Sequence, residues 1–160
     1  MKFITIISLL VFIISTSHAQ GDKVEIFQSG QKNLVYGSIC IFGPGASANG
    51  NYERMIAERN NKFFKTYWFR ISGGVYSAWE WGNGIHFITG VTMLSGSGKN
   101  HFEFNIGLTS IFDLASSVDN QYIFPAGILG YRYQKKDGHF VFRSGLGFPE
   151  IVYFSFGFCF

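Results

Sequence analysis

Histidine is the residue type in this chain best suited to proton transfer or metal binding near neutral pH. Beyond the first twenty residues the chain has three histidines, His86, His101 and His139. Their spacing fits no zinc motif. The chain also lacks a nucleophile elbow, a phosphate-binding loop and a glycine-rich dinucleotide loop placed before a helix. The sequence therefore predicts no metal site, no cofactor and no catalytic residue.

Ser144 is the serine that a membrane-embedded, lipid-modifying hydrolase could use, because it shares a strand face with Phe142 and Leu146. Such an enzyme also needs a histidine next to the serine. No histidine shares this strand face. We therefore expect a protein that is not an enzyme, and the hydrolase is kept as an alternative.

Charged residues are few within the apolar segments, and they alternate with large apolar residues. Arg70 lies between Phe69 and Ile71, and an aromatic residue directly precedes each of the other four inward charges named below. Side chains of a strand point alternately to its two faces, so the charges share the face opposite the phenylalanines. An unpaired buried charge is costly, and we expect one paired network. Its predicted members are Glu53, Arg70, Glu103, Arg132 and Arg143. Arg54 is the exception, close enough to a strand end to reach lipid headgroups.

These residues belong to eight segments with strand-like alternation, separated by short runs rich in Gly, Asn, Ser and Pro. No internal repeat, domain linker or helical periodicity is visible beyond the first twenty residues. The sequence predicts one all-β unit. Its expected strands are 33–42, 47–57, 65–78, 84–94, 100–112, 123–134, 139–147 and 151–160.

The last segment, "IVYFSFGFCF", indicates which medium the apolar faces of the strands contact. Phe154, Phe156, Phe158 and Phe160 share one face, and only 14% of the whole chain is charged. A charge on the lipid face of a barrel costs roughly 2–4 kcal/mol at the bilayer midplane, so segregated charges suit membrane insertion. The prediction is an eight-stranded antiparallel transmembrane β-barrel. Barrels of this size have an interior just wide enough to be filled by side chains, and we expect no open pore.

The N-terminus has the features of an export signal. Lys2 is followed by an apolar run and by the small-x-small site Ser17-His18-Ala19. We expect residues 1–19 to be a signal peptide, 20–32 a short extension and 33–160 the barrel. A net charge of +3 without a basic cluster gives no indication of nucleic acid binding.

Aromatic residues with polar tips lie near the expected strand ends, where amphipathic rings meet the lipid-water interface. They are Tyr67, Trp68, Trp79, Trp81, Tyr122, Tyr131, Tyr133 and Tyr153. The two cysteines, Cys40 and Cys159, are expected to face inward near opposite rims. We predict that they are free thiols, because a disulfide needs Cα atoms within about 7 Å.

Several segments resemble the small outer-membrane β-barrel proteins of the Bacteroidota. They are "NYER" (51–54), "GYRYQ" (130–134), "FVFRSGLG" (140–147) and the alternating last strand that ends in Phe160. The resemblance implies a location in the outer membrane and assigns no activity. In outer-membrane barrels generally, a last strand of this pattern resembles the signal read by the barrel-assembly machinery. This implies that Phe156, Phe158 and Phe160 matter for insertion.

The function expected from the sequence is that of an integral outer-membrane barrel with a structural or surface-interaction role. Its expected partners are outer-membrane lipid, lipopolysaccharide and, during insertion, the assembly machinery. The second alternative is a secreted lipocalin-like ligand carrier, since such barrels also have eight strands. That interpretation reverses the two faces and places the phenylalanines around a ligand.

Overall fold

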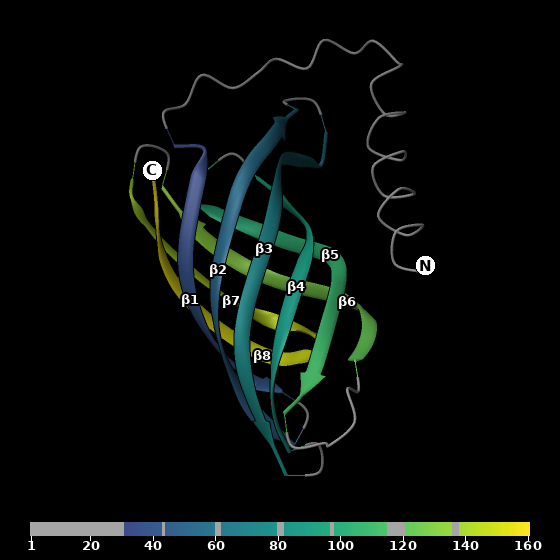
Figure 1. Ribbon diagram of the computed structural model, residues 1–160. Helices are drawn as coiled ribbons and strands as arrows, with labels where there is room; N and C mark the ends of the chain where they lie inside the picture. The colour runs from purple at the N-terminus through teal and green to yellow at the C-terminus, as the bar shows by residue number, and fades with distance from the viewer. Residues whose placement is uncertain are drawn as a thin grey trace, which may run out of the picture.

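The protein folds as eight β-strands in a single closed sheet (Figure 1). This computed structural model describes residues 31–42, 44–59, 62–79, 82–96, 98–114, 121–135 and 138–160. The strands are β1 (Asn33–Phe42), β2 (Gly45–Glu58), β3 (Phe64–Ala78), β4 (Gly82–Ser95), β5 (Asn100–Asp113), β6 (Gln121–Gln134), β7 (Phe140–Phe148) and β8 (Glu150–Cys159). The predicted all-β fold is confirmed. The expected signal peptide (1–19) and most of the extension (20–32) lie outside the described residues.

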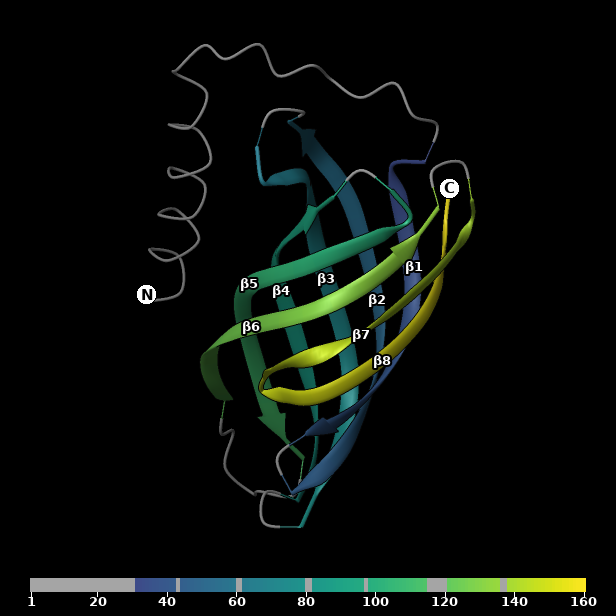
Figure 2. The same cartoon turned by 180° about the vertical axis from the view of Figure 1, so that it is seen from behind.

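Every strand is antiparallel to the next, and β8 pairs with β1 to close the barrel. β1 to β4 form the front wall in Figure 1, and β5 to β8 form the wall that Figure 2 shows from behind. β1 begins and β8 ends at the same rim, here called the terminal rim; the other end is the far rim. Within the described residues, no helix has the length and apolar character needed to cross a membrane.

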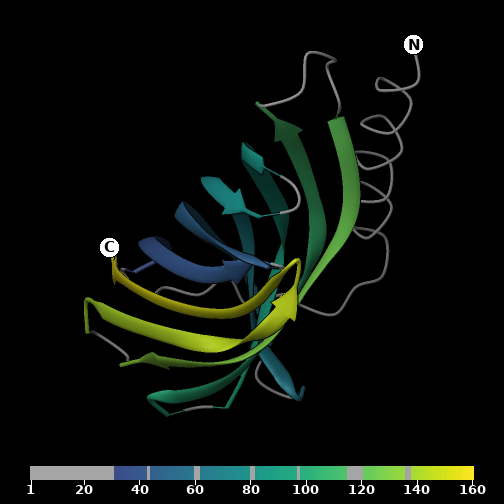
Figure 3. The ribbon, with the colours of Figure 1, turned by 90° about the horizontal axis from the view of Figure 1, so that it is seen from below.

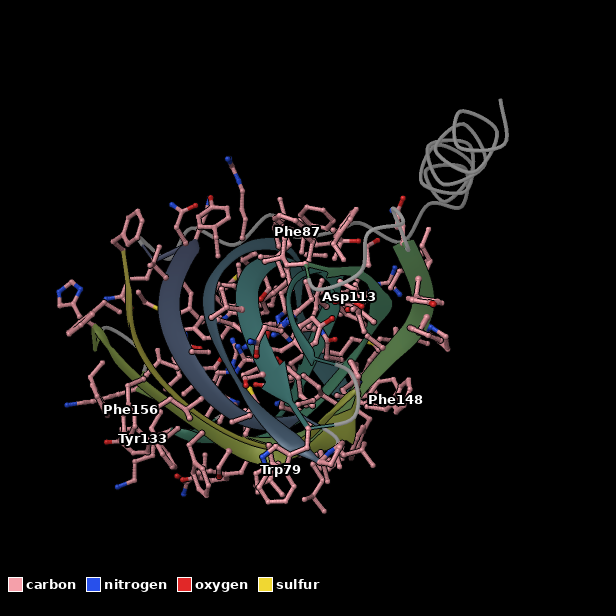
Figure 4. All side chains as sticks on the ribbon, turned by 60° about the horizontal axis from the view of Figure 1, so that its bottom comes forward. Trp79, Phe87, Asp113, Tyr133, Phe148 and Phe156 are labelled. Carbon is pink, nitrogen blue, oxygen red and sulfur yellow. The ribbon has the colours of Figure 1, made fainter. Side chains whose placement is uncertain are left out.

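The alternation in the sequence decides which side chains fill the barrel. Along β8, Tyr153, Ser155 and Cys159 are buried, whereas Phe154 and Phe158 between them are exposed. The same alternation holds along β3 and β5. Charged and polar side chains therefore point into the lumen together with three small apolar clusters, and large apolar side chains cover the outside. Figure 4 shows this for Phe87, Phe148 and Phe156, which lie outside the ribbon.

The far rim has a step, because β7 is shorter than β6. β7 has nine residues and β6 has fourteen. Their pairing begins at Gly127 and Phe148, so among the described strands residues 121–126 of β6 pair with β5 alone. Residues 121–125 are exposed whichever way they point. Figure 3 shows the start of β6 turned away from the β7–β8 hairpin.

Candidate functional site

The lumen holds all five charged residues that the alternation places on the inner face. Glu53 (β2), Arg70 (β3), Glu103 (β5), Arg132 (β6) and Arg143 (β7) are each at most 2% exposed. They come from strands on both sides of the barrel, so their heads meet near its axis. The structure brings four of the five into one cluster, and Arg70 has a different ionic partner.

The four-charge cluster consists of Glu53, Glu103, Arg132 and Arg143. Arg132 donates to Glu53 Oε2 through Nη2 at 2.5 Å and to Glu103 Oε2 through Nε at 2.8 Å. Arg143 donates to Glu53 Oε1 through Nη1 at 3.0 Å and to Glu103 through Nη2 and Nε. Each carboxylate thus binds both guanidinium groups. This arrangement ties β2 and β5 to β6 and β7 across the lumen.

Aromatic rings and hydroxyl groups enclose this cluster. Tyr36 donates to Glu53 Oε1 at 2.9 Å, and its ring lies 4.2 Å from the Arg143 guanidinium carbon. Thr92 donates to the same carboxylate oxygen at 3.1 Å. The Trp68 ring lies 5.6 Å from the guanidinium carbon of Arg132. Such cation–π contacts stabilise a guanidinium where water is excluded.

The expectation that Trp68 and Tyr153 lie at the lipid-water interface is wrong. Both are buried in the lumen, at 1% and 2% exposure. Trp68 shares the inner face with Arg70, two residues further along β3, so alternation overrides its position near a strand end. Trp81, for which the same location was expected, lies outside the described residues.

Arg70 forms a second ionic contact, with Glu150 rather than with the cluster. Its Nη2 lies 3.6 Å from Glu150 Oε2, and Nε and Nη2 donate to Asn51 Oδ1 at 3.2 and 2.8 Å. Glu150 also accepts hydrogen bonds from Asn49 and from Cys40 Sγ, the latter at 3.3 Å.

Glu150 is a lumen residue that the alternation in the sequence does not predict. Strict alternation places it on the outer face with Val152 and Phe154. The β1–β8 pairing shifts between Ile41 and Phe42, so that Ile41 pairs with Val152 and Phe42 pairs with Glu150. A one-residue shift reverses the face of a side chain. The bulge therefore turns Glu150 into the lumen.

With Glu150 included, the charges in the lumen balance. Three carboxylates (Glu53, Glu103, Glu150) face three guanidinium groups (Arg70, Arg132, Arg143), and their sum is zero. Trp68, Arg132 and Arg143 are among the largest side chains that are fully buried. At the level of the cluster the lumen is filled, and the charged groups are engaged with one another. The arrangement suits mechanical cross-linking of the wall better than proton transfer or transport.

The other residues that could take part in catalysis or bind a metal lie apart from one another. His86 is fully buried on the inner face of β4, whereas Ser144 lies on the outer side of β7, paired with Tyr131 and Phe154. The described residues contain no group of three or more His, Cys, Asp or Glu side chains that could hold a metal ion.

Both cysteines are buried, free thiols. Cys40 pairs with Tyr153, whereas Cys159 pairs with Leu34, six residues earlier on β1. At about 3.3 Å per residue, this offset separates them by roughly 20 Å. The prediction that no disulfide joins them is therefore confirmed.

Glycines make room for the backbone of neighbouring strands and for the lumen tyrosines, and Gly145 does both. A Cβ added there would contact the Leu129 carbonyl oxygen, lie 2.6 Å from the Gly130 Cα atom and lie 2.9 Å from Tyr153 Cε1. We expect Gly145→Ala to lower the free energy of unfolding by about 1–3 kcal/mol through overpacking. Urea titration of the folded barrel, followed by tryptophan fluorescence, measures this.

Gly37→Ala is the matched control, because a Cβ at Gly37 meets nothing within 4 Å. It should change the free energy of unfolding by less than about 0.5 kcal/mol. Equal losses in the two variants would show that backbone flexibility, rather than the packing of Tyr153, explains the glycine at position 145.

The fold and its filled, charged lumen define the protein as a closed eight-stranded antiparallel β-barrel with a polar interior. Comparison with protein-family models, curated proteins and solved structures found no match.

Proposed function

We propose that the protein is an integral outer-membrane β-barrel with a structural or surface-interaction role and a lumen that does not conduct. The observation that carries this proposal is the direction of its side chains: charges are paired inside, and large apolar residues are exposed outside. The outward apolar residues include Ile39, Ile71, Val75, Phe87, Ile106, Leu129, Leu146, Phe154, Phe156 and Phe158.

The energetic argument concerns the outer wall. Soluble monomers rarely expose a contiguous apolar patch larger than a few hundred Å². Here exposed apolar side chains occur on all eight strands. A closed barrel also satisfies its backbone hydrogen bonds within the wall, as hydrocarbon requires. Lipid is the medium that best matches this surface.

A secreted lipocalin-like carrier shares the eight-stranded barrel, so the fold alone agrees with both functions. A carrier of apolar ligands needs a lumen lined by apolar side chains. The lumen here contains six paired charges together with Asn51, Thr92 and Asn105, and its apolar residues form three separate small clusters. This lining favours the membrane proposal.

Cell fractionation tests the proposal. We expect the protein in outer membranes, with a band on gels that migrates differently before and after boiling, as stable barrels do. Purified protein added to a planar bilayer should insert without stepwise conductance. A protein that is monodisperse in buffer without detergent would contradict the proposed location, and stepwise conductance would contradict the closed lumen.

The last strand provides a prediction about assembly. Phe156, Phe158 and Phe160 all point outward and are more than half exposed, so their rings contribute little to packing within the barrel. Phe160→Ala should strongly reduce the amount of heat-modifiable barrel in outer membranes. Its refolding in detergent should match that of the natural protein. Poor refolding in detergent would assign Phe160 a role in stability instead of in assembly.

A further inference from the structure

Outside the lumen, all lysines and arginines of the described residues lie at the terminal rim. Three of the described cations are the lumen arginines; the other seven are Lys32, Arg54, Arg59, Lys62, Lys65, Lys99 and Lys135. The described part of the far rim contains Asp113 and no lysine or arginine. The barrel is therefore electrically polarised along its axis.

The seven cations occur all around the rim, and five of them lie at β1 to β3. Lys32 precedes β1, Arg59 and Lys62 lie between β2 and β3, Lys99 lies between β4 and β5, and Lys135 follows β6. Among the described residues of this rim, Glu58 is the one acidic side chain. Its negative charge and the seven positive side-chain charges sum to +6. Most of these cations are exposed. We call this set the basic ring.

Several tyrosines lie on the outer wall of the barrel, next to the basic ring and on its side toward the middle of the barrel. Tyr52 donates to Asn33 Oδ1 and Tyr131 donates to Asn100 Oδ1, each at 2.8 Å. The Tyr67 ring lies 5.8 Å from the guanidinium carbon of Arg59. Tyrosines with apolar rings and polar tips are typical of the lipid-water interface. The basic ring therefore lies at the level of the headgroups if the barrel spans a bilayer.

We propose that the basic ring binds the phosphate groups of anionic phospholipids in the leaflet around the terminal rim. This inference rests on the proposed membrane location. Lysine side chains near a membrane surface are attracted to anionic headgroups, and arginine pairs with phosphate through two hydrogen bonds. Lipids surround a barrel on all sides, as the cations do, whereas a folded protein partner would contact only one sector of the ring.

The test measures lipid selectivity. The barrel is refolded into phosphatidylcholine vesicles that contain spin-labelled phosphatidylglycerol or spin-labelled phosphatidylcholine, and the fraction of each lipid immobilised at the wall is recorded. We expect the natural protein to prefer phosphatidylglycerol several-fold at low salt. The preference should fall at high salt, because salt screens exposed charges.

Two variants with the same four substituted positions give the matched comparison. The variant Lys62→Gln, Lys65→Gln, Lys99→Gln and Lys135→Gln should lose most of the preference. The corresponding Lys→Arg variant keeps the charge and should retain it. Equal immobilisation of both lipids by the natural protein, or an unchanged preference in the Gln variant, would overturn the proposal.

Insertion is scored separately, by heat-modifiable migration in phosphatidylcholine vesicles that contain no anionic lipid. A barrel that inserts without lipid preference contradicts only the basic ring as a lipid-binding site. A barrel that fails to insert into any vesicle contradicts the proposed function itself.

Discussion

Arg143→Met is expected to lower the free energy of unfolding by about 3–5 kcal/mol, the usual cost of removing one partner from a buried ion pair. Arg143 contacts both Glu53 and Glu103, which are fully buried. Without it, two carboxylates share the single guanidinium of Arg132. Methionine retains much of the side-chain volume, so the loss reports charge rather than packing. Urea titration of the barrel in lipid vesicles, followed by tryptophan fluorescence, measures it.

Arg54→Met is the matched control, because Arg54 is exposed on the outer face. In vesicles that contain no anionic lipid, it should leave the free energy of unfolding within about 0.5 kcal/mol or raise it. Adding Glu103→Gln to Arg143→Met should recover part of the loss, since contacting charges are coupled. Additive effects of Arg143→Met and Glu103→Gln would contradict the four-charge cluster.

Phe154→Arg is the second substitution with a large expected effect, and it separates a lipid-facing wall from a water-facing wall. Phe154 is 54% exposed on the outer face of β8 and pairs with Ser144, the middle residue of β7. In a bilayer, arginine at this depth should destabilise the barrel by about 2–4 kcal/mol. On a protein surface in water, the same change should stay within about 0.5 kcal/mol. Unfolding of the barrel in vesicles measures the difference.

Phe140→Arg is the control for depth. Phe140 is also an exposed apolar residue, but it begins β7 at the terminal rim. An arginine there reaches the headgroups, and the expected cost falls to roughly 0–1 kcal/mol. Similar small effects at positions 154 and 140 would contradict a wall in contact with hydrocarbon.

The alternation of residue types carried most of the information about the fold. Each expected strand end lies within two residues of the observed one, because Gly, Asn and Pro interrupt the alternation where the chain turns. The inward direction of Glu53, Arg70, Glu103, Arg132 and Arg143 follows from the same pattern, because each lies between outward neighbours.

The pairing of these charges could not be predicted in the same way. Glu53 and Arg132 are 79 residues apart in the chain and meet across the lumen, at a point set by the tilt and stagger of all eight strands. Glu150 was missed because a single bulge changes the register beside Phe42. Local alternation contains no information about such a shift.

If the barrel spans a bilayer, as proposed, the step at the far rim limits how deeply it is immersed. Among the described strands, residues 121–126 have no partner on one edge, and hydrocarbon does not tolerate unpaired backbone groups. Immersion must therefore stop near Phe148, where β7 ends; nine tilted residues span about 23 Å. Beyond this limit the taller wall carries exposed polar residues, Ser77 and Asn83, and also exposed apolar residues, Ile123 and Phe124. In that orientation the ends of β3 to β6 project beyond the bilayer into water. They form a curved wall that is open on the side of the β7–β8 hairpin.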